Sequence, residues 1–541
     1  MAEQSKQITL AIDGKPVTVP DGTTVLQACE KAGSPVPFYC YHPGLSIAGN
    51  CRICLVEIEG MPKLQISCYT RAADGMKVRT TSDKTLDGRK SVLEFLLINH
   101  PLDCPVCDQA GECWLQDYYM QYGLYDQRFN ETKNKKPKAV PIGKTVMLDA
   151  ERCILCSRCV RFTDEITKTG ELGIFNRGDR SEIGIQPGQT LDHNNYSGNV
   201  VDICPVGALT DRDFRFKCRV WYLGSAPSVC PGCSRGCNID IHYNREREWR
   251  PHIAGGERVM RLKPRHNPDV NQWWMCDKGR YAYRGIDKHR IAHVQLRDAG
   301  GARQSTWDDG YARLKTVLGR ITATKSMDQA GVILSSHLTN EDLFAAKRFF
   351  GELGLSQVVF QRPKAGQADG FLLQADWSPN GRGAEALGLR EGAESLLLLA
   401  EQKKLRMLLV FTQDLTELFG GSRVQAAATQ LELLVFIGPN ENPTASLAHV
   451  VLPGAAYAEK DGTFTNFEGR VQRIKAAVGL WGEAKPEWHI LSELAGALGL
   501  KTAFADAPSI FAELAKSERA FQGLSYQAVG DQGALLKDAR G

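Results

Sequence analysis

The chain of 541 residues has no cysteine after Cys276, although it contains 17 cysteines in all. It also lacks any run of about 18 to 20 apolar residues, the length that crosses a bilayer. Its first residues, Met-Ala-Glu-Gln-Ser-Lys, contain no apolar signal segment. We therefore expect no direct membrane insertion and no export through the Sec route. In the reducing compartment that this implies, cysteines are metal ligands more often than disulfides.

Charge of one sign is also missing, because 66 basic and 62 acidic residues leave a formal net charge of +4. Such a balance argues against nucleic acid or an anionic membrane surface as a partner. Two locally basic stretches, 133–138 and 245–265, are expected to be solvated loops or docking edges.

Nucleotide-binding motifs are absent as well. No Gly-x-Gly-x-x-Gly fingerprint follows a strand, and Gly143-Lys144-Thr145 lacks the first glycine of a P-loop. The chain itself is therefore not expected to bind NADH. A length of 541 residues suggests roughly three to five domains.

The first cysteine group follows a ferredoxin-like order of elements. Strands predicted at 7–12 and 17–19 flank Asp13-Gly14, which favours a primed hairpin turn, and a short helix is predicted at 23–32. The cysteines are spaced C-x10-C-x2-C, and a fourth follows after thirteen residues. Four thiolates suit a [2Fe–2S] cluster, with structural zinc as the alternative. The predicted ligands are Cys40, Cys51, Cys54 and Cys68.

The second group combines one histidine with three cysteines, directly after an apolar helical run at 92–98. One imidazole and three thiolates suit a [4Fe–4S] cluster, and taken alone they suit zinc equally well. The position immediately behind the [2Fe–2S] pattern favours the cluster. The predicted ligands are His100, Cys104, Cys107 and Cys113.

The third group follows a polar, proline-bearing linker at 130–141 and has a C-x2-C-x2-C run, a strong [4Fe–4S] signal. In a two-cluster bacterial ferredoxin a cysteine would stand four positions later, where this chain has Thr163. The fourth ligand must come from elsewhere, and Cys204-Pro205 supplies it. The predicted ligands are Cys153, Cys156, Cys159 and Cys204.

A fourth group, C-x2-C-x3-C with a distant Cys-Asp-Lys-Gly-Arg, also indicates a [4Fe–4S] cluster. Its predicted ligands are Cys230, Cys233, Cys237 and Cys276. Cys29 and Cys218 remain, and both are predicted to be buried, unreactive thiols. Further on, segments 331–334, 340–344 and 407–411 indicate buried strands with intervening helices, which predicts an α/β region.

The four groups, their order and the sequence Cys-Pro-Val-Gly-Ala-Leu at 204–209 resemble the large iron–sulfur subunit of NADH–quinone oxidoreductase, respiratory complex I. Segment 450–472 is similar to one shared by that subunit and molybdopterin oxidoreductases. The resemblance implies an α+β multidomain protein with five parts. These are a β-grasp [2Fe–2S] ferredoxin-like domain (1–90), a one-histidine/three-cysteine [4Fe–4S] segment and linker (91–140), a four-cysteine [4Fe–4S] ferredoxin-like domain (141–222), a molybdopterin-oxidoreductase-type [4Fe–4S] domain (223–285) and a truncated molybdopterin-oxidoreductase-like α/β region (286–541).

The resemblance also implies a route for electrons. They would enter at the [2Fe–2S] site, pass to the Cys153 site and then the His100 site, and leave toward quinone, with the Cys230 site off the path. The implied cofactors are one [2Fe–2S] and three [4Fe–4S] clusters. No molybdopterin is expected, because the region is short for a molybdenum enzyme and offers no late cysteine. Lys278, which matches a superfamily pattern between cluster and pterin, would then be structural.

The implied partners are a flavin/NADH-binding subunit, other hydrophilic-arm subunits and, indirectly, the membrane arm. The chain would be peripheral, on the cytoplasmic side of the inner membrane. One alternative is the iron–sulfur subunit of an NAD-linked hydrogenase or formate dehydrogenase. A hydrogenase should show adjacent bacterial ferredoxin runs and later cysteines, and a formate dehydrogenase should be longer and offer a metal ligand. A zinc-stabilised scaffold is a second alternative.

Overall fold

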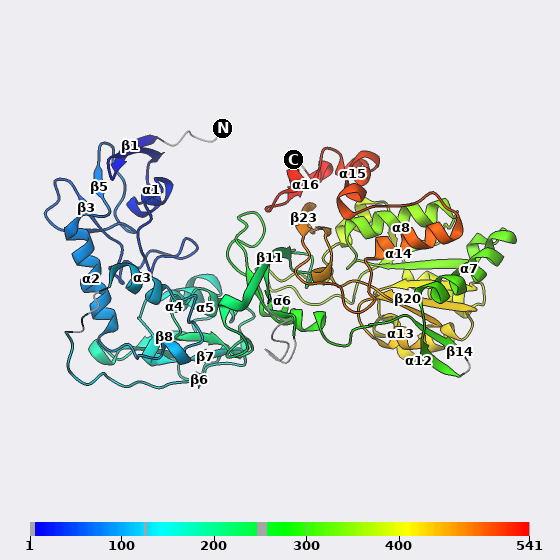
Figure 1. The fold of residues 1–541 in the computed structure, drawn as a ribbon, viewed down its shortest axis with the longest axis horizontal. Coiled ribbons are helices and arrows are strands. Elements are labelled where there is room, and N and C mark those ends of the chain that lie inside the picture. Colours follow the sequence, from blue (N-terminus) through cyan, green and yellow to red (C-terminus); the bar gives the residue numbers. More distant parts are fainter. Residues whose placement is uncertain (1–5, 124–125, 127, 246–256, 299, 540–541) are drawn as a thin grey trace. The chain divides into compact units, whose positions relative to one another are not determined.

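The computed structural model describes residues 6–123, 126, 128–245, 257–298 and 300–539. The chain forms two compact units, Met1–Tyr222 and Leu223–Gly541 (Figure 1). Most of the N-terminal segment that was expected to lack an export signal, and positions 246–256 of the second basic stretch, lie outside the described residues. Within the described ranges, no helix has the length and apolar character needed to cross a membrane.

The first unit begins with a five-stranded mixed sheet packed against one helix, α1. Asp13 and Gly14, at φ 47° and 80°, join the first two strands, and both positive angles suit a primed turn. Helix α1 (Val25–Lys31) begins at a capping box formed by Thr24 and Gln27. The predicted hairpin and helix are thus confirmed. The sheet order is β2-β1-β5-β3-β4, with β1 Gln7–Ile12, β2 Lys15–Pro20, β3 Leu55–Ile58, β4 Gln65–Ile66 and β5 Lys77–Arg79.

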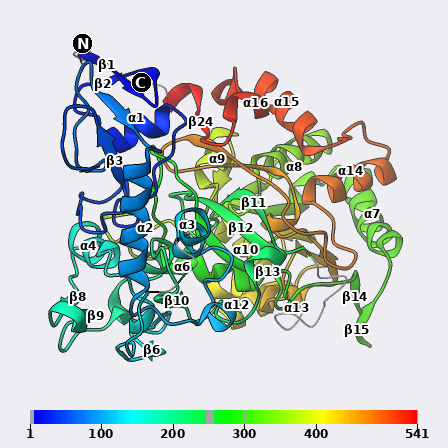
Figure 2. The same ribbon diagram turned by 60° about the vertical axis from the view of Figure 1, so that its left-hand side comes forward.

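The rest of this unit is built from short elements around one long helix, α2 (Asp83–Leu97), which Figure 2 shows along its length. Ser82 caps α2 through a hydrogen bond from the Thr85 amide. The polar linker predicted at 130–141 has no helix or strand among its described residues until β6. The remaining elements used below are α3 Trp114–Tyr122, β6 Val140–Pro141, β7 Val146–Leu148, α4 Arg158–Arg161, β8 Leu172–Phe175, β9 Glu182–Ile185, α5 Asn199–Asp202 and β10 Leu209–Asp211.

The second unit opens with a three-stranded antiparallel sheet of β11 (Leu223–Val229), β12 (Asn238–Asn244) and β13 (Val259–Pro264). Helix α6 (Asp277–Tyr281) follows it. The loop between β11 and β12 contains three of the four cysteines of the fourth group, and Cys276 caps α6.

An eight-stranded sheet forms the body of this unit, in the order β15-β14-β21-β20-β19-β16-β17-β18. Neighbouring strands from β21 to β18 run parallel, whereas β14 and β15 are antiparallel. Its strands are β14 Gln295–Asp298, β15 Gly301–Gln304, β16 Ala330–Ser335, β17 Val358–Gln361, β18 Arg390–Glu391, β19 Met407–Phe411, β20 Leu433–Gly438 and β21 Val450–Pro453. The strands predicted at 331–334 and 407–411 are present, whereas 340–344 begins a helix, α8.

Helices cover both faces of the sheet, as Figure 1 shows for α8 and α14 on one side and α12 and α13 on the other. Burial on both faces explains why the central strands are continuous apolar runs. The helices are α7 Trp307–Ala323, α8 Asn340–Glu352, α9 Gly381–Ala386, α10 Ala393–Glu401, α11 Leu415–Phe419, α12 Gly421–Ala428, α13 Pro443–Leu447, α14 Glu487–Leu498, α15 Ala507–Ser517 and α16 Tyr526–Val529. A small sheet of β22 (Gly462–Thr465), β23 (Arg470–Ile474) and β24 (Ala534–Leu535) completes the unit.

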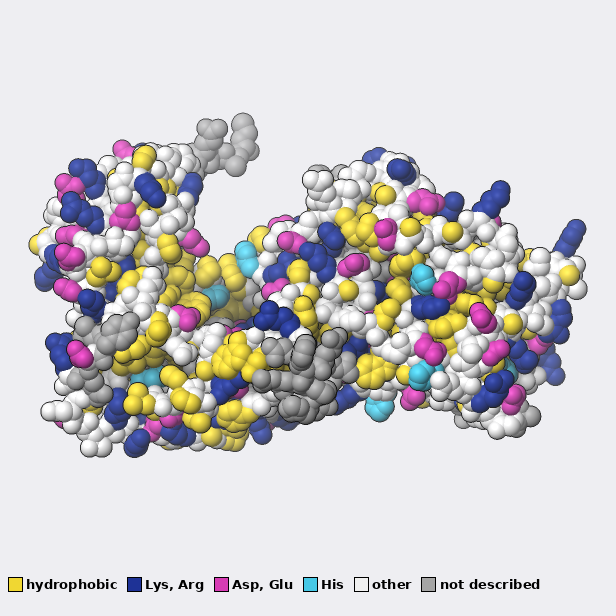
Figure 3. Space-filling view, viewed as in Figure 1, with side chains coloured by type: hydrophobic (Ala, Val, Ile, Leu, Met, Phe, Trp, Pro, Cys, Tyr) yellow, Lys and Arg dark blue, Asp and Glu magenta, His cyan; other side chains and the backbone are white. Residues whose placement is uncertain are grey.

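Basic and acidic side chains are intermingled over the face drawn in Figure 3. Part of the first basic stretch is bonded within the protein rather than free. Lys133 donates to the Leu97 and Ile98 carbonyls at 2.8 and 2.7 Å. The ammonium therefore caps the C-terminal end of α2, where a positive charge is favourable.

Candidate metal centres

The first cysteine group is gathered between α1 and the sheet of the N-terminal domain. The Cys40 amide donates to Cys51 Sγ at 3.4 Å. The Cys40 and Cys54 thiols each make a hydrogen bond with Cys68, so the four predicted ligands form one connected set. Gly49, at φ 63°, provides a left-handed turn in the loop just before Cys51.

The second group lies where α2 ends and α3 begins. His100, Cys104 and Cys113 line a cavity of about 410 Å³ whose other walls are largely apolar. Cys107 interacts electrostatically with Cys104 and Cys113. Burial, assisted by the nearby charge of Arg152, lowers the pKa of His100 to about 4. The imidazole is therefore neutral near pH 7, which is the form that binds a metal.

The third group encloses a small cavity lined by all four of its predicted ligands, from the loop before α4 and the turn after α5. Leu155 and Ser157, at φ 55° and 62°, turn this loop twice within three residues. Burial raises the pKa of Cys153 and of Cys204 to about 12. Without a metal these thiols would remain protonated, so a cation must displace their protons.

The fourth group also encloses one small cavity, and its four cysteines line it together with glycines. A Cβ atom at Gly279 would lie 2.7 Å from Cys230 Sγ, and one at Gly232 would lie 3.4 Å from the same sulfur. The missing side chains let the backbone approach a group held between the sulfurs, as the chemistry of an iron–sulfur cluster requires. The residues present therefore fit a cluster.

A site for a single metal ion needs several ligands grouped around one point. Among the described residues, no three His, Cys, Asp or Glu side chains are grouped so that they could hold one metal ion. The two cysteines left without a predicted ligand role, Cys29 and Cys218, are both buried, and burial raises the pKa of Cys29 to about 12.

One apolar core joins the first three sites. Tyr39, Leu93, Leu115 and Val206 lie in it. Cysteines from all three sites pack into the same core, namely Cys40, Cys51, Cys113, Cys153, Cys156 and Cys204. At the junction of the second and third sites, a Cβ atom at Gly207 would collide with Cys107 Sγ. The three sites are therefore neighbours within one unit.

Local spacing did not reveal the residues that hold the loop of the fourth site. Gln472 in β23 donates to the Gly236 carbonyl at 2.8 Å. Asn466 Nδ2 donates to the Arg235 carbonyl at 3.3 Å, and the Phe467 amide donates to Ser234 O at 3.0 Å. The hairpin of β22 and β23 thus fixes the cysteine loop from more than 230 positions away. The only signal in the sequence was the resemblance of segment 450–472 to molybdopterin oxidoreductases.

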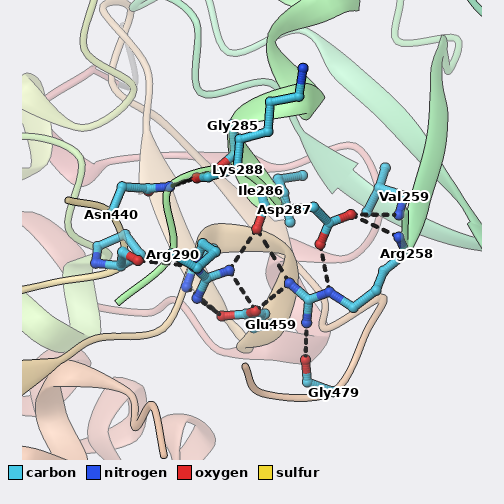
Figure 4. Close-up of polar contacts among 12 residues, drawn as sticks. Arg258, Val259, Gly285, Ile286, Asp287, Lys288, Arg290, Asn440, Glu459 and Gly479 are labelled. Atoms are coloured by element: carbon cyan, nitrogen blue, oxygen red, sulfur yellow. Dashed lines mark hydrogen bonds and ion pairs between the residues drawn. The ribbon is translucent and has the colours of Figure 1, made fainter. Parts of the chain in front are cut away.

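Other polar residues of that segment have buried partners. Figure 4 shows Glu459 between Arg258 and Arg290, which approach its carboxylate to 2.6 and 2.7 Å. Lys460 forms ion pairs with Asp342, at 2.6 Å, and Glu487. These contacts bind the residues around the fourth site to the α/β body.

Lys278 lies beside the fourth group and interacts electrostatically with its cysteines. Burial lowers the pKa of this lysine to about 8. Its ammonium lies over the ring of Trp377, a cation–π contact. The same ring fills the space that a side chain at position 366 would occupy.

Five family descriptions match successive parts of the chain. They are a 2Fe-2S iron-sulfur cluster binding domain (5–83), an NADH-ubiquinone oxidoreductase-G iron-sulfur binding region (89–128), the ferredoxin-like domain of NADH-quinone oxidoreductase subunit 3 (143–210), a molybdopterin oxidoreductase Fe4S4 domain (224–288) and molybdopterin oxidoreductase (380–497). The chain therefore contains domains of both the [2Fe–2S] and the [4Fe–4S] type.

Relatives matched over most of their length agree with these domains. The 78 kDa subunit of mitochondrial NADH-ubiquinone oxidoreductase from Neurospora crassa is 31% identical over 94% of this chain and 83% of its own. The corresponding NADH-quinone oxidoreductase subunit of Rickettsia felis is 30% identical over 96% and 91%. The mitochondrial NADH dehydrogenase iron-sulfur protein 1 of Solanum tuberosum is 39% identical over 74% of this chain, and the match spans about half, 52%, of that protein.

A solved structure of an NAD+-reducing [NiFe]-hydrogenase in the H2-reduced state is also similar, at 30% identity and a TM-score of 0.36. It covers 39% of this chain and 91% of its own.

A ferredoxin-like domain, further cluster-binding domains and a molybdopterin-oxidoreductase-like α/β region together define an iron–sulfur electron-transfer protein. The chain belongs to the family of the large iron–sulfur subunit of NADH–quinone oxidoreductase, the 75–78 kDa subunit of complex I. Membership over nearly the whole chain favours this interpretation over a hydrogenase or formate dehydrogenase subunit, and the cluster-domain matches favour it over a zinc scaffold. The chain is therefore one subunit of a multi-subunit oxidoreductase.

Proposed function

We propose that the chain relays electrons from a flavin-containing subunit toward quinone through one [2Fe–2S] and two [4Fe–4S] clusters. A third [4Fe–4S] cluster lies off this path. The proposed ligands are Cys40, Cys51, Cys54 and Cys68 for [2Fe–2S], then His100, Cys104, Cys107 and Cys113, then Cys153, Cys156, Cys159 and Cys204, and finally Cys230, Cys233, Cys237 and Cys276. The five domains proposed to hold them span 1–90, 91–140, 141–222, 223–285 and 286–541.

The shared apolar core of the first three sites is the observation on which this proposal rests. Clusters exchange electrons only when they are close and separated by protein rather than by solvent. The charges of Cys40 and Cys156 interact, which places the first and third sites side by side. The contact between position 207 and Cys107 joins the third site to the second. These two junctions support the order [2Fe–2S], Cys153 site, His100 site.

The fourth site has a different setting, which supports a structural role. All four of its cysteines belong to the second unit, whereas the three sites of the proposed path belong to the first. Its loop is bonded to the β22–β23 hairpin, so a cluster there would tie the start of this unit to its α/β body. We propose no molybdopterin in this unit, because Trp377 packs on Lys278 beside the cysteines.

The proposed partners follow from the relay. A flavin/NADH-binding subunit would deliver electrons at the [2Fe–2S] end, and another hydrophilic-arm subunit would accept them beyond the His100 site. The membrane arm would be an indirect partner, with the chain peripheral on the cytoplasmic side of the inner membrane. Neither NADH nor quinone is proposed to bind this chain, and nucleic acid is not a proposed partner.

The first test is anaerobic iron and acid-labile sulfide analysis, combined with low-temperature EPR of the dithionite-reduced protein. Full occupancy of the four sites corresponds to about 14 irons with one [2Fe–2S] and several [4Fe–4S] signals. Zinc without sulfide would overturn the proposal in favour of a scaffold.

The second test is the variant Cys51→Ala. We expect loss of the [2Fe–2S] signal and of NADH–quinone turnover in the assembled complex, while NADH–ferricyanide activity at the upstream flavin persists. Cys29→Ala is the matched control, because Cys29 is a buried thiol of the same domain without a ligand role. Undiminished quinone reduction by Cys51→Ala would contradict the proposed route.

A further inference from the structure

Arg158 is a fully buried arginine without a carboxylate partner among the described residues. Its side chain is 2% exposed and lies at the start of α4. The guanidinium donates to the carbonyls of Ile203 at 3.0 Å and Tyr41 at 2.5 Å, and it stacks on the ring of Trp114 at 4.6 Å. Its Nε atom is buried and has no hydrogen-bond partner in the described part of the chain. A buried cation in this state is unfavourable unless a negative charge is added nearby.

Arg152, only six positions earlier, shows the ordinary arrangement. It is also buried, and it forms ion pairs with Asp103 at 3.0 Å and Asp149 at 3.4 Å. Its charge is thus neutralised by carboxylates of the protein. Arg158 has only carbonyl dipoles and a ring face, so the described residues leave one full positive charge uncompensated.

The position of Arg158 indicates which negative charge is missing. Its guanidinium interacts electrostatically with Cys156 and Cys204 of the third site. It interacts in the same way with Cys40 and Cys51 of the first site. Two irons or four irons held by four thiolates have a net negative charge, and each added electron makes that charge larger. Arg158 therefore faces two anionic groups at once.

We propose that Arg158 is the shared counter-charge of the [2Fe–2S] cluster and of the Cys153-site [4Fe–4S] cluster, and that it raises the reduction potentials of both. This inference rests on the proposed ligand sets of these two sites. A fixed positive charge stabilises the reduced state more than the oxidised state, because the reduced cluster is more negative. The same residue then adjusts donor and acceptor together, which keeps the step between them small.

Arg89 in α2 offers a matched comparison. It is 1% exposed, donates to the Leu55 carbonyl at 3.0 Å and has no ion pair within the described part of the chain. Among the cysteines of the four sites, its strongest electrostatic interaction is with Cys54 of the first site. Arg89 is thus a buried cation beside one site, whereas Arg158 lies beside two.

The experiment is a redox titration of the purified complex, followed by low-temperature EPR of both clusters, for wild type, Arg158→Gln, Arg158→Lys and Arg89→Gln. Arg158→Gln retains hydrogen-bond donors and removes the charge. At a fixed potential, we expect it to lower the reduced-to-oxidised ratio of both clusters about tenfold or more, which is about 59 mV for one electron. Arg158→Lys should hold both potentials near wild type. Arg89→Gln should lower the [2Fe–2S] potential alone.

An unchanged potential at either cluster in Arg158→Gln would overturn the proposal. If that variant retains neither cluster, Arg158→Lys decides. Both clusters at wild-type potentials would support the role of the charge, and their loss in the lysine variant as well would show a packing role instead. Absence of the two EPR signals in the wild-type protein would overturn the proposed ligand sets rather than the role of Arg158.

Discussion

Replacing Glu459 by Gln is expected to destabilise the second unit by about 3 to 5 kcal/mol, the usual cost of leaving a buried charge unpaired. Two guanidiniums share this one carboxylate, so the change affects both. Arg258 would keep Asp287, at 2.6 Å. Arg290 would lose its only carboxylate among the described residues and keep only carbonyl acceptors, at 2.7 and 2.9 Å. The expected loss is therefore that of one buried, uncompensated cation, Arg290.

Hydrogen exchange of peptides from the eight-stranded sheet measures the opening free energy of this unit. The double variant Glu459→Gln/Arg290→Met removes the orphaned charge and should recover most of the loss. Glu483→Gln is the control, because Glu483 pairs with His293 at the surface and should contribute less than about 1 kcal/mol. A loss below about 1 kcal/mol for Glu459→Gln, or no recovery in the double variant, would refute the reasoning.

Two further predictions concern the second unit. Gly279→Ala should remove only the fourth cluster, lowering the iron content by about four, because its Cβ atom would lie 2.7 Å from Cys230 Sγ; Gly285→Ala, where a Cβ atom meets nothing within 4 Å, should keep all the iron. Burial raises the pKa of Glu341 from 4.5 to about 7, so its stabilisation is complete below pH 4.5 and is lost as the pH rises toward 7, by roughly 3 kcal/mol in all. Glu341→Gln should remove this part of the pH slope of the unfolding free energy, and an unchanged slope would contradict the assignment.

The sequence could predict features that depend on short spacing. The Asp13-Gly14 turn and the first helix form as expected, because two-residue turns and capping residues act locally. The cysteine groups were recognisable because C-x2-C runs place thiols on one turn of a loop. Segment 340–344 is helical, and a signal for this was present: Thr339 and Asp342 form a capping box at the start of α8.

Features that depend on distant pairing could not be predicted. Nothing near Gln472 indicates that it bonds to the loop of the fourth site, because a backbone acceptor leaves no mark in the sequence. The unpaired state of Arg158 was equally hidden. Its neighbours in the sequence include acidic residues, such as Asp164 and Glu165, and only the fold shows that none of them reaches it.

The bond between Gln472 and Gly236 has a consequence for biosynthesis. At about 5 to 20 residues per second, a ribosome needs roughly 10 to 50 s to make the intervening 236 residues. The predicted ligands of the first three sites are complete by Cys204, long before the hairpin that secures the fourth loop exists. Iron delivery to this chain would then be staged, with the first unit ready while the thiols of the fourth loop still await their support.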